Sequence, residues 1–168
     1  METRRGFFAS LALLAKPKED KPFHPLLPGF ISEKSHQCHT CETSSCQQVC
    51  EEGIVVREEG GSPYLDFSRR GCTFCGECIQ ACENDCFVAE PVERLEATIE
   101  IGILNCLAWN KTICRTCADV CNERAIHFTG LFNPQIDPAR CSACGFCIGV
   151  CPAYTISVKA PSLKGDTR

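Results

Sequence analysis

Apolar residues in the body of this chain cluster in segments of three or four positions, separated by turn-forming and charged residues. The segments are residues 54–56, 64–67, 87–89, 125–128, 135–137 and 155–158. The first two flank the stretch Glu-Glu-Gly-Gly-Ser-Pro and predict a short β-hairpin, and the fourth and fifth predict a second one. The segments 87–89 and 155–158 each predict a strand that closes one half of the chain. The pattern occurs twice, so the chain is expected to form two similar α+β units.

The longest apolar run, Phe7–Ala15, has nine residues and includes a serine. A helix that crosses a bilayer needs about 18, so we expect no integral membrane segment. The run follows Arg4 and Arg5, and twin arginine before a short apolar stretch is typical of an export signal. No convincing cleavage site follows, and apolar residues of the run would share one helical face. We therefore expect a retained docking helix, with a cleaved signal as the alternative.

Cysteine changes this picture, because the chain has 17 cysteines in 168 residues. Such a content is typical of a disulfide scaffold or a metal-cluster protein. The odd count and the tight grouping argue against a disulfide framework. Thiolates kept for metal need a reducing compartment, so we expect a cytoplasmic protein.

The last cysteine group, residues 141–152, has the spacing C-x2-C-x2-C-x3-C-P, which holds a cubane [4Fe-4S] cluster in bacterial-type ferredoxins. The second group has the same spacing with Glu83 in place of the proline. In the first group four residues, and not two, separate the second and third cysteines. In the third group seven residues, 107–113, separate the first cysteine from the second. Zinc sites instead use ligand pairs that a longer finger or ribbon separates. We predict four [4Fe-4S] clusters, and we expect the fourth cysteine of each group to lie in the first turn of a helix.

In two-cluster ferredoxins the fourth cysteine of one group binds the cluster of the other group. This exchange predicts four ligand sets from sixteen cysteines. The sets are Cys38, Cys41, Cys46 with Cys82; Cys72, Cys75, Cys78 with Cys50; Cys106, Cys114, Cys117 with Cys151; and Cys141, Cys144, Cys147 with Cys121. For the irregular first group, the alternative is a loop of free thiols or a labile cluster.

Four other residues are candidates for a role near the clusters. Cys86 is left over by the grouping, and we expect a small buried apolar residue, with a replacement ligand as the alternative. His36 and His39 bracket Cys38, and we expect ordinary loop residues because all-cysteine ligation is the norm for cubanes. Trp109 is expected to cover a cluster, with a docking anchor as the alternative.

We divide the chain into an N-terminal helix with a proline-rich linker at 1–30, ferredoxin-like units at 31–95 and 96–160, and a polar tail at 161–168. Each unit is too short to bury much apolar surface. The clusters are therefore expected to organise the small cores, and the chain without them is expected to be largely unfolded.

The formal net charge is −4, and four clusters with their thiolates would bring it to about −12. This charge disfavours nucleic acid and favours a partner with a positive face. No phosphate-binding loop, nucleophile–base pair or carboxylate dyad occurs in the sequence. We expect no enzyme activity and no small-molecule substrate, only transfer of single electrons.

The twin arginine and the segment Cys106-Leu107-Ala108-Trp109, with its displaced ligands, resemble the NapF family of ferredoxin-type proteins in periplasmic nitrate reductase systems. The resemblance covers nearly the whole chain, although the x4 spacing and Glu83 depart from the family pattern. It implies a cytoplasmic accessory protein with four [4Fe-4S] clusters. Such a protein would bind the precursor of the catalytic nitrate reductase subunit and assist its maturation before export, by electron donation or cluster assembly. The alternative is a polyferredoxin subunit of a respiratory oxidoreductase.

Overall fold

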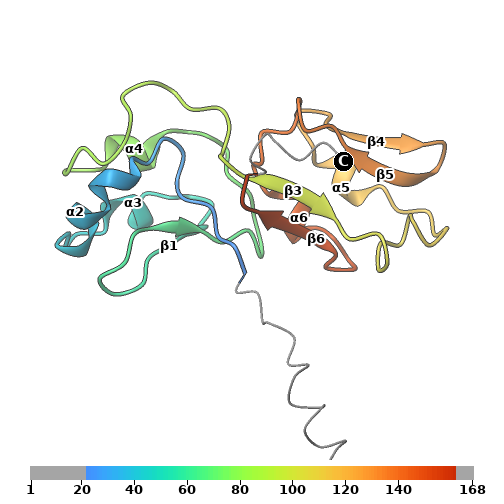
Figure 1. The fold of residues 1–168 in the computed structure, drawn as a ribbon, viewed down its shortest axis with the longest axis horizontal. Coiled ribbons are helices and arrows are strands. Elements are labelled where there is room, and N and C mark those ends of the chain that lie inside the picture. The colour runs from blue at the N-terminus through green and yellow to red at the C-terminus, as the bar shows by residue number, and fades with distance from the viewer. Residues whose placement is uncertain (1–21, 162–168) are drawn as a thin grey trace, which may run out of the picture.

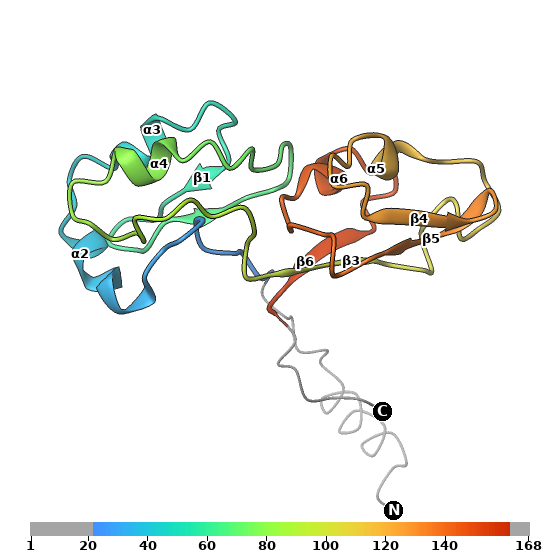
Figure 2. The ribbon, with the colours of Figure 1, turned by 90° about the horizontal axis from the view of Figure 1, so that it is seen from above.

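The computed structural model describes residues 22–161, so the expected N-terminal helix and most of the C-terminal tail lie outside the described residues. Within this range the longest helix and the longest strand each have five residues, because cysteines and turns interrupt every apolar segment. These short elements form two lobes that lie side by side along the long axis of the molecule (Figures 1 and 2). No helix in the described part is long and apolar enough to cross a membrane.

The first lobe contains one hairpin, one 3-10 turn and three short α-helices. Its elements are η1 (Ser32–Lys34), α2 (Ser35–His39), α3 (Ser45–Gln48), β1 (Val55–Val56), β2 (Tyr64–Leu65) and α4 (Glu77–Gln80). Strands β1 and β2 pair antiparallel with Val55 opposite Leu65, which confirms the first predicted hairpin. Leu65 and Phe67 are buried beneath it and form much of the small core.

The second lobe repeats this plan with longer strands. Its elements are β3 (Thr98–Ile101), α5 (Thr116–Asp119), β4 (Ile126–Thr129), β5 (Phe132–Ile136), α6 (Phe146–Gly149) and β6 (Ile156–Lys159). Strands β4 and β5 form the second predicted hairpin. Strand β6 is the predicted closing strand, and its antiparallel partner is β3, which the sequence analysis did not predict. In this pair Ile99 and Ile156 are buried, so one face of the two-stranded sheet packs on the core.

The expected closing strand of the first lobe is reduced to a single bridge between Phe30 and Phe87. Backbone hydrogen bonds from Ile31 to Cys86 and from Val88 to Gly29, each 2.9 Å long, extend this contact. Residues 29–31 therefore take the place in the first lobe that β3 takes in the second.

The proline-rich stretch that leads into the first lobe was expected to be a linker without a core of its own. From Pro22 onward the structure differs, because this stretch packs on the first lobe. Leu27 is only 3% exposed, and Leu26 bridges Tyr64 at the edge of the hairpin. The prolines keep the backbone extended, and the two leucines and Phe30 between them supply the apolar contacts.

The cysteines occupy equivalent positions in α3, α4, α5 and α6. Each of these four-residue helices holds the third cysteine of its group as its second residue, and the fourth cysteine follows two positions after the helix ends. The expectation that the fourth cysteine lies in the first turn of a helix is therefore wrong. The residue three positions after each fourth cysteine has a left-handed backbone, with φ between 49° and 63°. The fourth cysteine therefore lies at the start of the turn by which the chain leaves the helix. The turn residues are Gly53, Asp85, Arg124 and Tyr154.

The buried position of Leu27 generates a test of whether the stretch from Pro22 belongs to the first lobe. Leu27→Ala should destabilise the protein by about 2 to 5 kcal/mol, because truncating a buried leucine leaves a cavity. The adjacent Leu26 is 39% exposed and provides a matched control, for which Leu26→Ala should have a much smaller effect. The measurement is the urea concentration at which far-UV circular dichroism is lost under argon. Equal midpoints for the two variants would contradict the packed arrangement.

Candidate iron–sulfur cluster sites

Four pockets each gather one predicted set of four cysteines, and Cys86 also lines one of them. The sets are Cys38, Cys41, Cys46 and Cys82; Cys50, Cys72, Cys75 and Cys78; Cys121, Cys141, Cys144 and Cys147; and Cys106, Cys114, Cys117 and Cys151. We call these sites 1, 2, 3 and 4 in that order. Each set combines three cysteines of one group with the fourth cysteine of the neighbouring group. The structure thus brings together the same four sets that ligand exchange between groups predicts.

Paired helices produce this exchange. Helix α3 packs beside α4 in the first lobe, and α5 packs beside α6 in the second. The third cysteine lies within each helix and the fourth lies just beyond its end, so the two cysteines face different sites. Cys46 of α3 belongs to site 1, for example, whereas Cys50 belongs to site 2. One short helix therefore connects the two sites of a lobe.

The donor atoms suit a [4Fe-4S] cluster. Each site offers four cysteine sulfurs, the soft ligands that iron–sulfur clusters use. The remaining lining of site 4 is mostly apolar, with Ile101, Ala108 and Ile156 among its residues. Within residues 22–161, no three Cys, His, Asp or Glu side chains converge closely enough to hold a single metal ion. The thiols instead line the walls of pockets, as ligands to a multi-iron group do.

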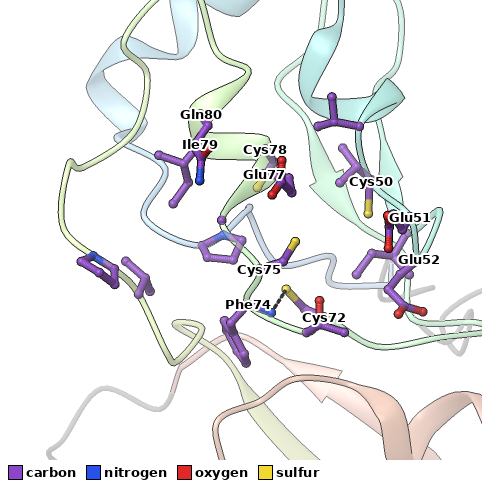
Figure 3. Close-up of a pocket in the computed structure, with 18 of the residues that line it drawn as sticks. Cys50, Glu51, Glu52, Cys72, Phe74, Cys75, Glu77, Cys78, Ile79 and Gln80 are labelled. Atoms are coloured by element: carbon purple, nitrogen blue, oxygen red, sulfur yellow. Dashed lines mark hydrogen bonds between the residues drawn. The ribbon is translucent and has the colours of Figure 1, made fainter.

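Site 2 differs from the others in the size of its cavity and in the exposure of one of its cysteines. It opens into a cavity of about 460 Å³, whereas the cavities of the other three sites measure about 20 to 30 Å³. Cys75 is exposed at this site. Figure 3 shows three carboxylate side chains, Glu51, Glu52 and Glu77, among the lining residues of the same pocket. Site 2 is thus both open and acidic.

Burial raises the pKa of several of the thiols. It raises the pKa of Cys72 and of Cys117 to about 11, and that of Cys78 to about 12, with a smaller contribution from neighbouring thiols. Burial also raises the pKa of Cys147, the most strongly affected of the set. These four thiols therefore keep their protons at neutral pH unless a positive charge enters the pocket. Binding of iron would supply that charge and release protons.

Backbone amides approach two of the sulfurs. The amide of Phe74 lies 3.4 Å from Cys72 Sγ, and the amide of Ala125 lies 3.3 Å from Cys121 Sγ. Phe74 has a φ of 57°, a left-handed conformation that turns its amide back toward the preceding cysteine. Amide hydrogen bonds to ligand sulfurs stabilise negative charge and are one determinant of cluster potential.

The irregular first group is held in place by Arg57, which the sequence analysis did not single out. Its guanidinium donates to the carbonyl oxygens of Cys38 and Cys41, the latter at 2.8 Å, and to Ser44 Oγ at 2.6 Å. A further bond joins it to Gly61 at 3.1 Å. One side chain thus bonds to the start of the x4 loop at Cys41 and to its interior at Ser44. Nothing in the sequence marks this role, since Arg57 reads as an ordinary charged residue after a strand.

Cys86 is 1% exposed, which confirms the expected buried position. It adjoins site 1, where its thiol lies within hydrogen-bonding reach of Cys38 and Cys82. Oxygen acceptors surround it, including Gln37 Oε1 at 3.5 Å and the Asn84 carbonyl at 3.6 Å. These acceptors favour a protonated thiol. Burial acts in the same direction and raises the pKa of Cys86 to about 12.

His36 and His39 are exposed, and neither is among the residues that line site 1. The expectation of loop residues is wrong, because both lie in α2, where Cys38 between them is the residue that faces the site. Trp109 is partly buried, and its indole N–H donates to the carbonyl of Pro134 in β5 at 3.1 Å. It therefore ties the inserted loop to the second hairpin, while the neighbouring Ala108 lines site 4.

The four hydrogen bonds of Arg57 generate a prediction for site 1. Arg57→Met should release the x4 loop, because bonds from a charged donor contribute about 1.5 to 3 kcal/mol each. With one [4Fe-4S] cluster lost, iron and acid-labile sulfide should each fall by about four per chain. The control is Arg140→Met, since Arg140 is exposed in the second lobe. Unchanged iron in Arg57→Met would show that the loop does not need this side chain.

The model of the 4Fe-4S binding domain family matches residues 134–157, the segment from β5 through α6 to the start of β6. The ferredoxin-type protein NapF of Escherichia coli (strain K12) is 32% identical over 146 residues, which cover 83% of this chain and 87% of the relative. The corresponding protein of Haemophilus influenzae is 33% identical over 92% of this chain and 89% of its own length. One subunit of an ion-translocating oxidoreductase complex from Methanosarcina acetivorans is 29% identical over 68% of this chain and 45% of the relative. This chain therefore belongs to the family of the ferredoxin-type protein NapF.

Proposed function

We propose that this chain is a cytoplasmic electron-transfer accessory protein of two tandem bacterial-type ferredoxin units, with four [4Fe-4S] clusters bound by the sixteen cysteines of sites 1 to 4. The observation that carries the proposal is the exchange of the fourth cysteine in all four sites. Disulfide frameworks and zinc sites do not require this arrangement, whereas paired cubanes do.

The sites support electron transfer and not substrate chemistry. A bound [4Fe-4S] cluster supplies a one-electron change of oxidation state. The protein supplies a complete set of four thiols at each site, so no iron position is left for a substrate. Burial of Cys106, Cys117 and Cys151 limits the access of water to site 4, and amides such as that of Phe74 help to stabilise the negative charge on sulfur at site 2.

We propose the precursor of the catalytic subunit of periplasmic nitrate reductase as the partner, on the basis of the NapF relatives. Its maturation before export would require reducing equivalents or help in installing its own cluster. The alternative is an electron-transfer subunit that serves a respiratory oxidoreductase at every turnover. The similarity to a subunit of an ion-translocating oxidoreductase complex favours that alternative.

Charge indicates which lobe receives the partner. Residues 22–95 hold twelve acidic and five basic side chains, whereas residues 96–161 hold five of each. The open site 2 lies in the acidic lobe, with Cys75 exposed and Glu77 beside it (Figure 3). A positively charged surface of the partner would be steered to this lobe and would meet a cluster there.

Chemical analysis tests the cofactor content. Protein purified without oxygen should contain about sixteen iron and sixteen acid-labile sulfide per chain, the content of four cubanes. A value near twelve would show that one site, most simply the irregular site 1, is empty or labile. Zinc without sulfide would refute the ferredoxin assignment.

Timing separates the two functional alternatives. A maturation factor acts once per enzyme molecule, so nitrate reductase that has already matured should stay active after this protein is depleted. Reductase synthesised after depletion should be inactive, and restoring the protein should recover it only for newly made enzyme. The measurement is nitrate reduction with physiological electron donors before and after depletion. Immediate loss of activity of the matured enzyme would favour the respiratory subunit.

A further inference from the structure

We infer that the contact between the two lobes joins the four sites into one continuous electron path, in which the electron crosses between Cys72 of site 2 and Cys144 of site 3. This inference rests on the proposed cluster sites and adds their order and their connection. The path runs from site 1 through sites 2 and 3 to site 4.

A direct backbone hydrogen bond links the two middle sites. The amide of Cys72 donates to the carbonyl of Cys144 at 2.7 Å. Both residues are proposed ligands, one in each lobe. The protein part of the path between site 2 and site 3 therefore consists of two cysteines and one hydrogen bond, with no intervening side chain.

Glycines on both sides make this close approach possible. A Cβ atom at Gly71 would lie 2.5 Å from the amide nitrogen of Phe146 and 2.6 Å from the carbonyl oxygen of Cys144. A Cβ atom at Gly149 would lie 2.5 Å from the carbonyl oxygen of Arg69. The obstructing atoms belong to the backbone and cannot move as a side chain would. Any side chain at either position would push the lobes apart.

A second set of contacts holds the lobes where the chain passes from one to the other. The amide of Leu95 donates to the carbonyl of Ser142 at 3.0 Å. The guanidinium of Arg94 donates to the carbonyls of Pro138 and Ala139. Helix α6 lies at the edge of the second lobe that is nearest the first in both views (Figures 1 and 2). The connection is thus fixed at the loop that carries Cys141, Ser142 and Cys144.

Within each lobe the helices complete the path. Cys46 and Cys50 border α3 and belong to sites 1 and 2, and Cys117 and Cys121 border α5 and belong to sites 4 and 3. At each step one site is oxidised by one electron and the next is reduced by one, and no proton is transferred. An external one-electron reductant supplies the electron, and the partner receives it.

The test uses the full-length protein purified without oxygen and reduced with dithionite. Gly71→Leu and Gly149→Leu open the contact from either side. Thr129→Leu is the control, because Thr129 is exposed at the end of β4 and is not among the residues that line the four sites. Frozen-solution EPR measures magnetic coupling between the reduced sites. Both contact variants should lose the coupling between lobes and keep the coupling within each lobe, while the control matches the wild type.

Iron and sulfide analysis separates the possible failures. Wild-type protein without the cluster content of four cubanes would refute the proposed function itself. Full cluster content with unchanged coupling in both contact variants would overturn the inferred crossing alone. If both variants lose clusters, the EPR spectrum of the reduced wild-type protein tests the path instead. Magnetic coupling among all four sites would support the path. Coupling only within each lobe, as two separate pairs of sites, would overturn it.

Discussion

A [4Fe-4S] cluster requires four thiolates around one small volume, and in this chain the four cysteines of each site come from segments far apart in the sequence. Each site takes three cysteines from one loop and the fourth from the partner group, so no site is complete until both groups of a lobe have come together. Binding at the sites is thereby coupled to folding. Strands of two to five residues and helices of four or five suffice because the cofactors are expected to cross-link them.

The same requirement explains how the protein tolerates irregular loops. In the first group two extra residues separate the second and third cysteines, and Arg57 closes the longer loop with bonds to the carbonyls of Cys38 and Cys41. In the third group the inserted residues form a compact turn, in which Asn110 Nδ2 donates to the Cys106 carbonyl at 2.9 Å and Trp109 is bonded to β5. Loop length varies while the positions of the sulfurs are kept.

The two lobes share a plan but differ in their surfaces. The first is acidic and has an open site with the exposed Cys75, whereas the second has balanced charge and exposes apolar side chains such as Ile103 and Leu104 on the loop before site 4. An electron path that joins sites 1 to 4 would therefore lead from an acidic lobe to a lobe of balanced charge. Such a difference suits a protein that receives electrons at one surface and passes them on at another.

The pattern of apolar segments and turns by itself determined the repeat and the two hairpins, because each hairpin is a local structure. The cysteine spacing determined the composition of all four sets, because the exchange follows from the position of the fourth cysteine. The ligand role stays a prediction. The sequence did not reveal β3, since Thr98–Ile101 becomes a strand only by pairing with β6, which follows the whole second lobe. Likewise, Leu27, Arg57 and Gly71 look ordinary along the chain. Only tertiary packing buries the leucine, places the guanidinium against two carbonyls and sets the glycine against Cys144, because these contacts join segments that the sequence separates.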